Sequence, residues 1–460
     1  MFCALIDLEK VYDQVPKEVV YWTLRKKGVA ERMVQEMYRA IQMANRMSPL
    51  KHINVKDKNL IEDLVCKATD YAFGNGICMK TENDVLGTIP FTLFPSSFPR
   101  LQYEKVKKHS KGYKSPLSLG LFRTDYLLHE VDSNKLSIKQ VETNTIASSF
   151  AIMASRMVGL HRYIIQNLPN ELTLGELENI NMSFIGRSII VFLVENINSN
   201  IFDQRGLEYE VIKSDPKVKI VFATYKDLHE KCSLNDDNIL FYNGEEVALV
   251  YLRTGYHPRF FTCENDWSAS LLVERSKAIK CPPVQYHLAG CKKIQQVICE
   301  PGVLEKFISN PETITHMRET FAKIYSLEMN EQGNKAVELG ICQPENYVLK
   351  PQREGGGNNL YGNEMKQKLL ELKNSPERAS YILMERIFPP TIQSYLVKQG
   401  QVTEATPIVS ELGIYGYILG SSSEIVTNSV AGHVIKSKAE FEDEGGIAAG
   451  YAFIDSPNFI

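Results

Sequence analysis

Short β-rich runs alternate with helical segments along most of this chain, and this alternation most restricts its fold. The runs are SIKQVETN at 137–144, SIIVFLVEN at 188–196, VKIVFATY at 218–225, EVALVYLR at 246–253 and NYVLKPQ at 346–352. Apolar spacing predicts helices over 17–46, over 60–73 and within SASLLVERSKAIK at 268–280. Strands that alternate with helices indicate an α/β architecture. We therefore predict an α/β protein.

The chain is too long for a single hydrophobic core. At 460 residues it exceeds the size at which one core keeps growing, so more than one structural unit is expected. Three of the strand-like runs lie between 188 and 253. We predict that residues 188–291 form a separate α/β unit, inserted between two parts of a larger one.

Charge and cysteine usage restrict the compartment and the partners. With 52 basic and 55 acidic residues the net charge is -3, which offers no electrostatic footprint for nucleic acid and no basic patch for a membrane. The nine cysteines are scattered and form no C-x-x-C pair. The first residues carry Asp7 and Glu9, and the longest apolar run, at 189–194, is too short to span a bilayer. These features predict a soluble, cytoplasmic protein that acts on small molecules.

A glycine triplet, Gly355 to Gly357, lies in LKPQREGGGNNLYG. It matches neither a P-loop, because no Gly-Lys-Ser/Thr follows, nor a Rossmann fingerprint. An isolated triplet is usually a surface turn. Here Lys350 could bind phosphate, Glu354 could bind Mg²⁺, and the glycines expose N–H groups to an anion. With these flanks the segment is interpreted as a lid over a nucleoside triphosphate.

Glu142 and Asn144 are a candidate metal pair. They lie two residues apart in KQVETNT, so both side chains point to the same face of the predicted strand. A carboxylate beside an amide oxygen is a suitable partial shell for Mg²⁺, and Glu354 would complete it. Taken alone, the pair would be interpreted as a solvated strand face.

Lysines and arginines supply further candidates for anion binding. Lys292 and Lys293 are adjacent, and Lys436 precedes Lys438 by two residues. Lysine binds phosphate as a point charge, although such pairs are more often solvated surface. Three arginines could bind substrate carboxylates or form structural ion pairs: Arg123, Arg253 and Arg259.

From about residue 57 to its end the chain resembles the eukaryotic glutathione synthetases, which are ATP-grasp ligases. The resemblance runs in order through PFTLFPS, LGLFRTDY, KQVETNTIASSF, NIFDQR, YLRTGY, LLVERSKAIKCP, LAGCKKIQQ, LKPQREGGGNNLYG, YILMERI, SELGIYG and EGGIAAGYAFIDSP. It implies an ATP-grasp fold in two parts, at 57–187 and 292–460 with the lid, around an inserted α/β substrate-binding domain at 188–291.

The resemblance also implies an activity. Members of this family use ATP to join γ-glutamylcysteine and glycine through an acyl phosphate, usually as homodimers. Two alternatives remain open at this point. The chain could be an impaired or inactive homologue that keeps nucleotide or dimer binding, or a ligase that uses another small amino acid as acceptor.

Site residues follow from the resemblance, position by position. Mg²⁺ would be held by Glu142, Asn144 and Glu354. ATP would be bound by Glu142, Lys292, Lys350, Pro351, Gln352, Arg353, Glu354, Gly355, Gly356, Gly357, Asn358, Asn359, Tyr361, Met384, Glu385, Arg386, Ile387, Glu411, Lys438 and Glu444. The peptide and glycine would contact Arg123, Ile146, Ala147, Ser148, Ser149, Asn198, Ser199, Asn200, Gln204, Arg253, Thr254, Gly255, Tyr256, Lys436, Ile447 and Ala448. Catalytic roles would belong to Arg123, Ser149, Gly355 and Lys436.

The chain departs from the family in several places. Residues 1–46 instead resemble a fragment of a non-LTR retrotransposon reverse transcriptase around its first catalytic aspartate, here Asp7, but no Tyr-x-Asp-Asp motif follows, so no polymerase activity is expected. A short lysine-rich link near 97–116 stands where the family has a longer helical stretch. Lys436 stands where the family more often has arginine, and lysine lacks the bidentate fork for carboxylates.

Overall fold

The computed structural model describes residues 58–80, 85–98, 117–132, 135–166, 188–196, 200–215, 217–353, 357–421, 425–447 and 450–459. The retroelement-like segment with its predicted helix at 17–46, and nearly all of the shortened link at 97–116, lie outside these residues. Within them the chain is a mixed α/β protein, as predicted. No helix of the described residues is both long and apolar enough to cross a membrane.

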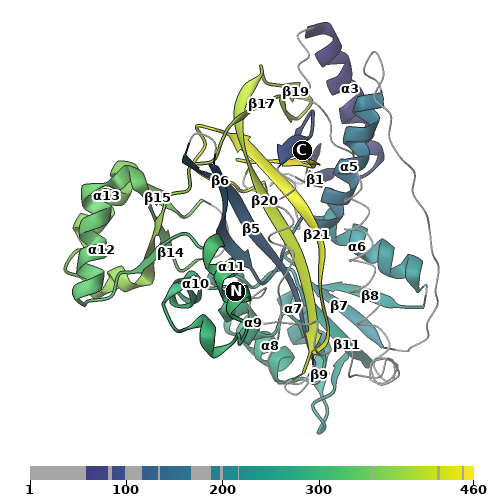
Figure 1. Ribbon diagram of the computed structural model, residues 1–460. Coiled ribbons are helices and arrows are strands. Elements are labelled where there is room, and N and C mark those ends of the chain that lie inside the picture. The colour runs from purple at the N-terminus through teal and green to yellow at the C-terminus, as the bar shows by residue number, and fades with distance from the viewer. Residues whose placement is uncertain are drawn as a thin grey trace.

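A sheet of nine described strands forms the centre of the molecule (Figure 1). Its order is β19-β18-β3-β22-β21-β20-β5-β6, with β17 on β20. The strands are β3 (Phe91–Thr92), β5 (Ser118–Asp132), β6 (Lys135–Asn144), β17 (Ile392–Ser394), β18 (Leu396–Lys398), β19 (Gln401–Val402), β20 (Thr406–Gly420), β21 (Ile425–Ala439) and β22 (Phe453–Asp455). Strands far apart in sequence therefore share one sheet: β20 pairs with both β21 and β5.

Two helices, α3 (Lys58–Gly74) and α5 (Ala151–Gln166), pack beside this sheet in Figure 1. Their apolar faces meet at Leu64, Ala68 and Met157, which are fully buried, in a core shared with Val434 and Ile454 of the sheet. The helix predicted over 60–73 is thus confirmed as α3. Short strands accompany this region: β1 (Cys78–Lys80) pairs with β2 (Leu86–Thr88), and β4 (Ser96–Phe98) with β23 (Pro457–Phe459).

A second sheet has the order β8-β7-β11-β10-β9, with β12 on β11. Its strands are β7 (Ile189–Leu193), β8 (Lys219–Ala223), β9 (Cys232–Leu234), β10 (Leu240–Tyr242), β11 (Glu245–Leu252) and β12 (Ile279–Cys281), and its helices are α6 (Ile201–Ser214), α7 (Tyr225–Lys231) and α8 (Glu264–Arg275). All five residues of β7 are buried, as expected for an uninterrupted apolar run in a parallel sheet.

The prediction for SASLLVERSKAIK is partly wrong. Helix α8 ends at Arg275, and Ser276 turns the chain into an extended conformation. The last three residues of that stretch include Ile279 and Lys280, which belong to the buried strand β12. The apolar spacing of a helix and of a short buried strand overlap there, so periodicity alone placed the boundary too late.

A third, smaller unit lies at the left of Figure 1. Its sheet has the order β13-β16-β14-β15, formed by β13 (Ile324–Ser326), β14 (Tyr347–Pro351), β15 (Leu360–Tyr361) and β16 (Tyr381–Glu385), and it carries α12 (Glu331–Cys342) and α13 (Gly362–Leu372). Helices α9 (Val284–Ala289), α10 (Lys292–Cys299) and α11 (Pro311–Thr320) connect it to the second sheet in the chain.

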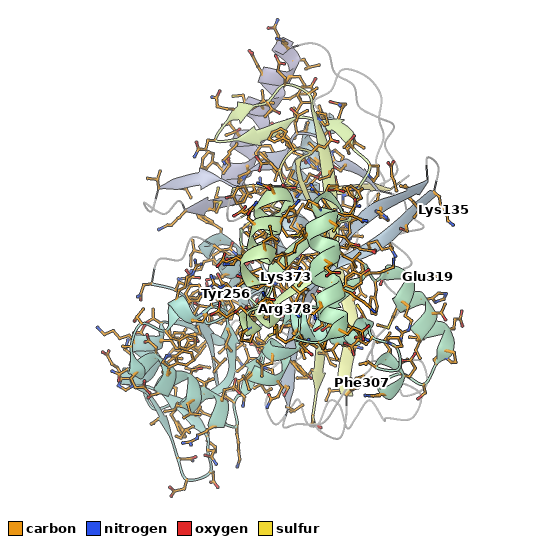
Figure 2. The ribbon with its side chains drawn as sticks, turned by 90° about the vertical axis from the view of Figure 1, so that its left-hand side faces the viewer. Lys135, Tyr256, Phe307, Glu319, Lys373 and Arg378 are labelled. Atoms are coloured by element: carbon orange, nitrogen blue, oxygen red, sulfur yellow. The ribbon has the colours of Figure 1, made fainter. Side chains whose placement is uncertain are left out.

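One buried arginine ties this small unit together. The Arg378 guanidinium donates to the carbonyls of Leu327, Lys373 and Glu328 at 2.6–2.8 Å, and also to the Asn334 side chain. Figure 2 shows Arg378 close to Lys373. Because a buried guanidinium requires partners for its N–H groups, these bonds fix the loops at one end of the unit.

The five predicted strands are all present as β6, β7, β8, β11 and β14. Strands β7, β8 and β14 fall within their β-rich runs, whereas β6 begins two residues and β11 one residue before its run. The long β20–β21 hairpin was not among the predicted elements. The architecture nevertheless agrees with the predicted α/β class.

Candidate active site

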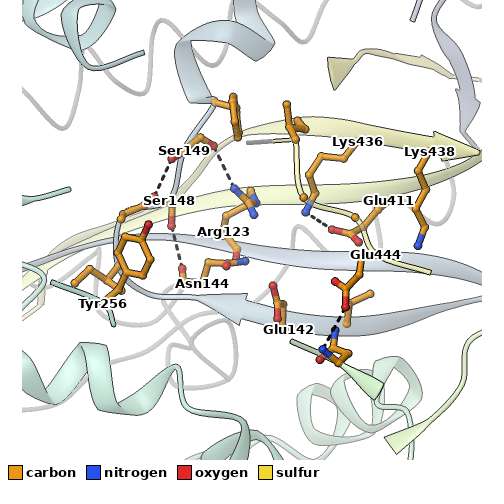
Figure 3. Close-up of a pocket in the computed structure, with 18 of the residues that line it drawn as sticks. Arg123, Glu142, Asn144, Ser148, Ser149, Tyr256, Glu411, Lys436, Lys438 and Glu444 are labelled. Atoms are coloured by element: carbon orange, nitrogen blue, oxygen red, sulfur yellow. Dashed lines mark hydrogen bonds and ion pairs between the residues drawn. The ribbon is translucent and has the colours of Figure 1, made fainter. Parts of the chain in front are cut away.

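A cavity of about 320 Å³ opens among the three sheets. Figure 3 shows part of its wall, to which strands β5, β6, β20 and β21 contribute. Twenty of the predicted site residues line it: Arg123, Glu142, Asn144, Ile146, Ala147, Ser148, Ser149, Asn200, Gln204, Arg253, Tyr256, Lys292, Lys350, Asn359, Tyr361, Glu411, Lys436, Lys438, Glu444 and Ile447. Residues more than 300 positions apart in the chain thus face one space.

The other predicted site residues fall into two groups. Those described but outside the cavity wall are Pro351, Gln352, Arg353, Gly357, Asn358, Met384, Glu385, Arg386, Ile387, Thr254 and Gly255. Those outside the described residues are Asn198, Ser199, Glu354, Gly355, Gly356 and Ala448. Two further basic candidates are not among the residues that line the cavity: Lys293 pairs with Glu328 at 2.7 Å, and Arg259 is exposed.

Four charged side chains form what we call the ion-pair cluster: Arg123, Asp125, Glu411 and Lys436. The Asp125 carboxylate accepts two bonds from Arg123, at 2.7 and 2.9 Å, and one from Lys436 at 2.8 Å. Lys436 also contacts Glu411, which lies directly opposite it across the β20–β21 ladder. Two cations and two anions therefore neutralise one another at the base of the cavity.

The electrostatics of the cluster follow from this pairing. Burial alone would raise the pKa of Asp125, but Arg123 and Lys436 lower it to about 2. Burial alone would lower the pKa of Lys436, but Asp125 and Glu411 raise it above its usual value. Burial raises the pKa of Glu411, and Lys436 opposes this effect. The salt bridges thus keep Asp125 and Lys436 charged despite their burial.

Asp125 is a central member of the site that sequence reasoning missed. It is fully buried, and besides the two cations it accepts a bond from Asn144 Nδ2 at 2.9 Å. A signal was present in FRTDY, because residues two apart on a strand share a face, which places Asp125 beside Arg123. The position of Gly413 fits this pair: a Cβ there would lie 2.8 Å from both side chains. Because glycine has no side chain, the Arg123–Asp125 ion pair can occupy the space above Gly413.

Three lysines, which we call the lysine group, are bonded differently. Lys292, Lys350 and Lys438 donate to main-chain carbonyls: to Arg353 at 2.9 Å, to Val141 at 3.3 Å and to Asp443 at 2.6 Å respectively. Lys292 also lies 3.7 Å from Glu142. Burial lowers the pKa of Lys350 and of Lys438. Carbonyl oxygens do not neutralise Lys350 or Lys438, so this part of the wall favours an anionic ligand.

Glu444 holds the rim of the cavity beside the lysine group. Its carboxylate accepts from the backbone N–H of Gly357 at 3.0 Å and of Asn359 at 3.2 Å. Next to it, the Tyr361 hydroxyl donates to the carbonyl of Asp443. The described end of the glycine-rich segment is therefore tied to the loop that follows β21.

The loop at 145–150 forms the opposite part of the wall and is conformationally strained. Ala147 and Phe150 have φ of 51° and 74°, in the left-handed region that non-glycine residues seldom adopt. Three side chains, which we call the loop anchor, hold it. Arg253 donates to the Ser148 carbonyl at 3.0 Å and to Ser149 Oγ at 2.8 Å, Tyr415 donates to the Ser149 carbonyl, and Asp203 accepts from Phe150 N and Ile152 N.

The donor set at Glu142 and Asn144 suits a hard cation. Both side chains line the cavity, and the Asn144 amide uses its nitrogen for Arg123 O and Asp125, which leaves its oxygen available as a donor to a cation. Burial alone would raise the pKa of Glu142, but Lys292 and Lys350 lower it, so the carboxylate stays ionised. Two oxygen donors of this kind fit Mg²⁺. No cluster of three or more His, Cys, Asp or Glu side chains with metal-binding spacing occurs among the described residues.

Comparison with known proteins identifies the family. The family model described as "Eukaryotic glutathione synthase, ATP binding domain" matches residues 102–459. The chain is 35% identical to the glutathione synthetase of Homo sapiens, over 88% of this chain and 98% of the human protein. It is 33% identical to that of Dictyostelium discoideum, over 86% and 98%, and 36% identical to the chloroplastic enzyme of Arabidopsis thaliana, over 76% and 67%.

The fold agrees with the sequence comparison. A glutathione synthetase-like effector from Globodera pallida, solved in its apo form, superposes with a TM-score of 0.67 over 88% of this chain and 98% of that one, at 21% identity. At 21% identity this likeness concerns the fold alone. The fold is the α/β, ATP-grasp fold that was predicted. By its sequence and its fold, this chain belongs to the glutathione synthetase family of ATP-dependent ligases.

Proposed function

We propose that this chain joins γ-glutamylcysteine to glycine at the expense of ATP, giving glutathione, ADP and phosphate. The observation that carries the proposal is the single cavity in which the lysine group, the ion-pair cluster and the loop at 145–150 face one another. A ligase of this kind must hold a triphosphate and two amino-acid substrates close together, and this cavity offers cations for the first and polar side chains for the others.

The first step phosphorylates the cysteinyl carboxylate. One carboxylate oxygen attacks the γ-phosphorus of ATP, the bond from that phosphorus to the β,γ-bridging oxygen breaks, and ADP leaves. Such transfers depend mainly on position and on positive charge around the phosphoryl group. Lys292 and Lys350 lie beside Glu142 in the wall and would supply that charge.

In the second step the amine of glycine attacks the acyl carbon. The C–N bond forms, the C–O bond to phosphate breaks, and the amine proton passes to solvent or phosphate. The acyl phosphate must be kept from water until then. The rim contacts of Glu444 with Gly357 and Asn359 would hold the described end of the glycine-rich segment over it.

Mg²⁺ would be held by Glu142 and Asn144, with Glu354 as a further predicted ligand beyond the described residues. When bound, it would offset the charge of the phosphate oxygens. The roles of the remaining predicted site residues are part of the same proposal.

We propose the same domain division as above: ATP-grasp parts at 57–187 and 292–460 around a substrate-binding unit at 188–291. Pairing of β5 with β20 joins the two outer parts in one sheet, which supports the division. A homodimer and a cytoplasmic location are proposed on the family resemblance.

Glycine-dependent ADP release tests the proposal. The purified chain is incubated with ATP, Mg²⁺ and γ-glutamylcysteine, with and without glycine, beside Glu142→Ala and the matched surface variant Glu246→Ala. We expect glycine to stimulate ADP release in the wild-type chain and in Glu246→Ala. If Glu142→Ala releases as much ADP as the wild-type chain does, the proposed function is wrong.

A further inference from the structure

Two residues of the cavity wall each have a buried polar atom without a hydrogen-bond partner among the described residues: Arg253 at Nε and Asn200 at Oδ1. Both residues line the cavity, and the Arg253 side chain is only 1% exposed. The terminal nitrogens of Arg253 already donate to Ser148, Ser149 and Tyr251. A buried donor and a buried acceptor without partners are costly, so a ligand is expected to satisfy them.

A carboxylate lies at the same end of the cavity. Glu195 follows strand β7 and lines the wall. Its charge acts on Tyr256, and the charges of Arg253 and Arg259 act on it, so these groups are close neighbours. Burial raises the pKa of Glu195, and the two arginines only partly oppose this effect. Within the described part of the chain its carboxylate makes no hydrogen bond or ion pair.

The other carboxylates that line the cavity are already engaged. Glu142 lies 3.7 Å from Lys292, and Glu411 contacts Lys436. Asp443 pairs with Arg386 at 2.6 Å, and Glu444 accepts the two rim N–H groups. Glu195 is therefore the lining carboxylate that is available to a cationic group of a ligand.

The proposed donor carries such a group. The free end of γ-glutamylcysteine is an α-amino acid, with one ammonium and one carboxylate on the same carbon. An N–H of arginine suits the carboxylate, while an amide oxygen and a second carboxylate suit the ammonium. We infer that Glu195 is a specificity-determining residue that binds the α-ammonium of the donor, with Asn200 Oδ1 beside it and Arg253 Nε on the adjoining carboxylate. The inference rests on the proposed function for the identity of the donor.

Binding of two donor peptides tests the role of Glu195. Calorimetric titration, in the presence of Mg²⁺ and a non-hydrolysable ATP analogue, compares γ-glutamylcysteine with glutarylcysteine, which lacks only the ammonium. For the wild-type chain we expect γ-glutamylcysteine to bind at least about tenfold more tightly, the factor typical of a charge-assisted hydrogen bond. E195Q should reduce this preference to about twofold, and E195D should retain part of it. The matched surface variant E246Q should behave as the wild-type chain does.

The outcomes separate this inference from the proposed function. A preference that E195Q leaves unchanged overturns the inference, whatever the ligase assay shows. If glycine-dependent ADP release fails but the preference depends on Glu195, the inference holds and the catalytic proposal does not. If the wild-type chain binds neither peptide, both are wrong. Should E195Q fail to fold, as judged by its melting temperature, E195D decides, because a preference equal to that of the wild-type chain would contradict the inference.

Discussion

The cations of the ion-pair cluster share one cavity with Lys350 and Lys438 of the lysine group, but the two sets differ in how the folded chain compensates their charges. Arg123 and Lys436 are paired with buried carboxylates, whereas Lys350 and Lys438 donate to main-chain carbonyls. The pKa of Lys436 is accordingly raised and that of Lys350 lowered. The paired cations hold the wall in a fixed shape. The cations that lack a carboxylate partner are free to bind an anionic ligand, and that binding would offset the cost of their burial.

Because of this difference, removing a member of the ion-pair cluster and removing Lys350 or Lys438 are expected to have different effects. Burial of a paired charge is compensated within the folded chain, so removal of one partner is expected to damage folding. Burial of a charge that has only carbonyl oxygens as partners is compensated when ligand binds, so its removal should damage activity and spare folding. Four predictions test this division.

The largest effect is expected for Asp125→Asn. The substitution leaves Arg123 and Lys436 without their shared carboxylate in a buried setting, which typically costs about 3–5 kcal/mol. We expect the free energy of unfolding in urea at pH 7 to fall by that amount, with loss of ligase activity. Asp237→Asn, an exposed aspartate, serves as control and should change stability by less than about 0.5 kcal/mol. If the two variants proved equally stable, the ion pairs of Asp125 would not stabilise the folded chain as proposed.

Lys350→Met is expected to separate activity from stability. Loss of a positioned cation at the transferring phosphoryl group should lower kcat/KM for ATP by about 10²–10³-fold. The melting temperature should stay the same or rise, because burial already disfavours this charge. Lys373→Met replaces an exposed lysine of the same small unit and should leave both quantities unchanged. If Lys350→Met lowered the melting temperature as much as Asp125→Asn does, Lys350 would stabilise the fold in the way that the ion-pair cluster does, and the contrast drawn above would be wrong.

Acidification should narrow the stability gap between the wild-type chain and Asp125→Asn. The pKa of Asp125 is about 2 in the folded chain against 3.8 as its ordinary value. A depressed pKa contributes stability that is fully present above the ordinary value and is lost as the pH falls toward 2. Between pH 6 and pH 3 the gap should shrink by about 1 kcal/mol, as measured by urea unfolding at each pH. A gap that widened on acidification would show that the carboxylate is not stabilised as an anion.

The sequence predicted local structure better than it predicted charge pairing. The run SIIVFLVEN at 188–196 indicates a buried strand by composition alone, and β7 occupies Ile189–Leu193 within it. The pairing of Asp125 with Lys436 joins residues 311 positions apart. It depends on β20 lying between β5 and β21, which no local pattern specifies.

The same limit applies to the candidate site. Family motifs named most of the residues that line the cavity, because each motif carries its own polar side chains. They did not include Glu195 or Asp443, which lie in the cavity wall between or beside the motif positions. Such residues become visible only when the loop after β7 and the loop after β21 are seen to face the same space.

The smallest effect is expected for Lys436→Arg, which keeps the charge and adds a planar fork. Because Asp125 and Glu411 already neutralise Lys436, the new guanidinium would remain within the ion-pair cluster and gain only an additional N–H toward a substrate carboxylate. We expect KM for glycine or the peptide to fall about threefold, with kcat changed by less than about twofold, in steady-state ADP release. Lys438→Arg, in the lysine group, should leave KM for both amino-acid substrates unaltered. If Lys436→Arg also left them unaltered, Lys436 would act only through Asp125 and Glu411, and the ion-pair cluster would shape the wall without contacting substrate.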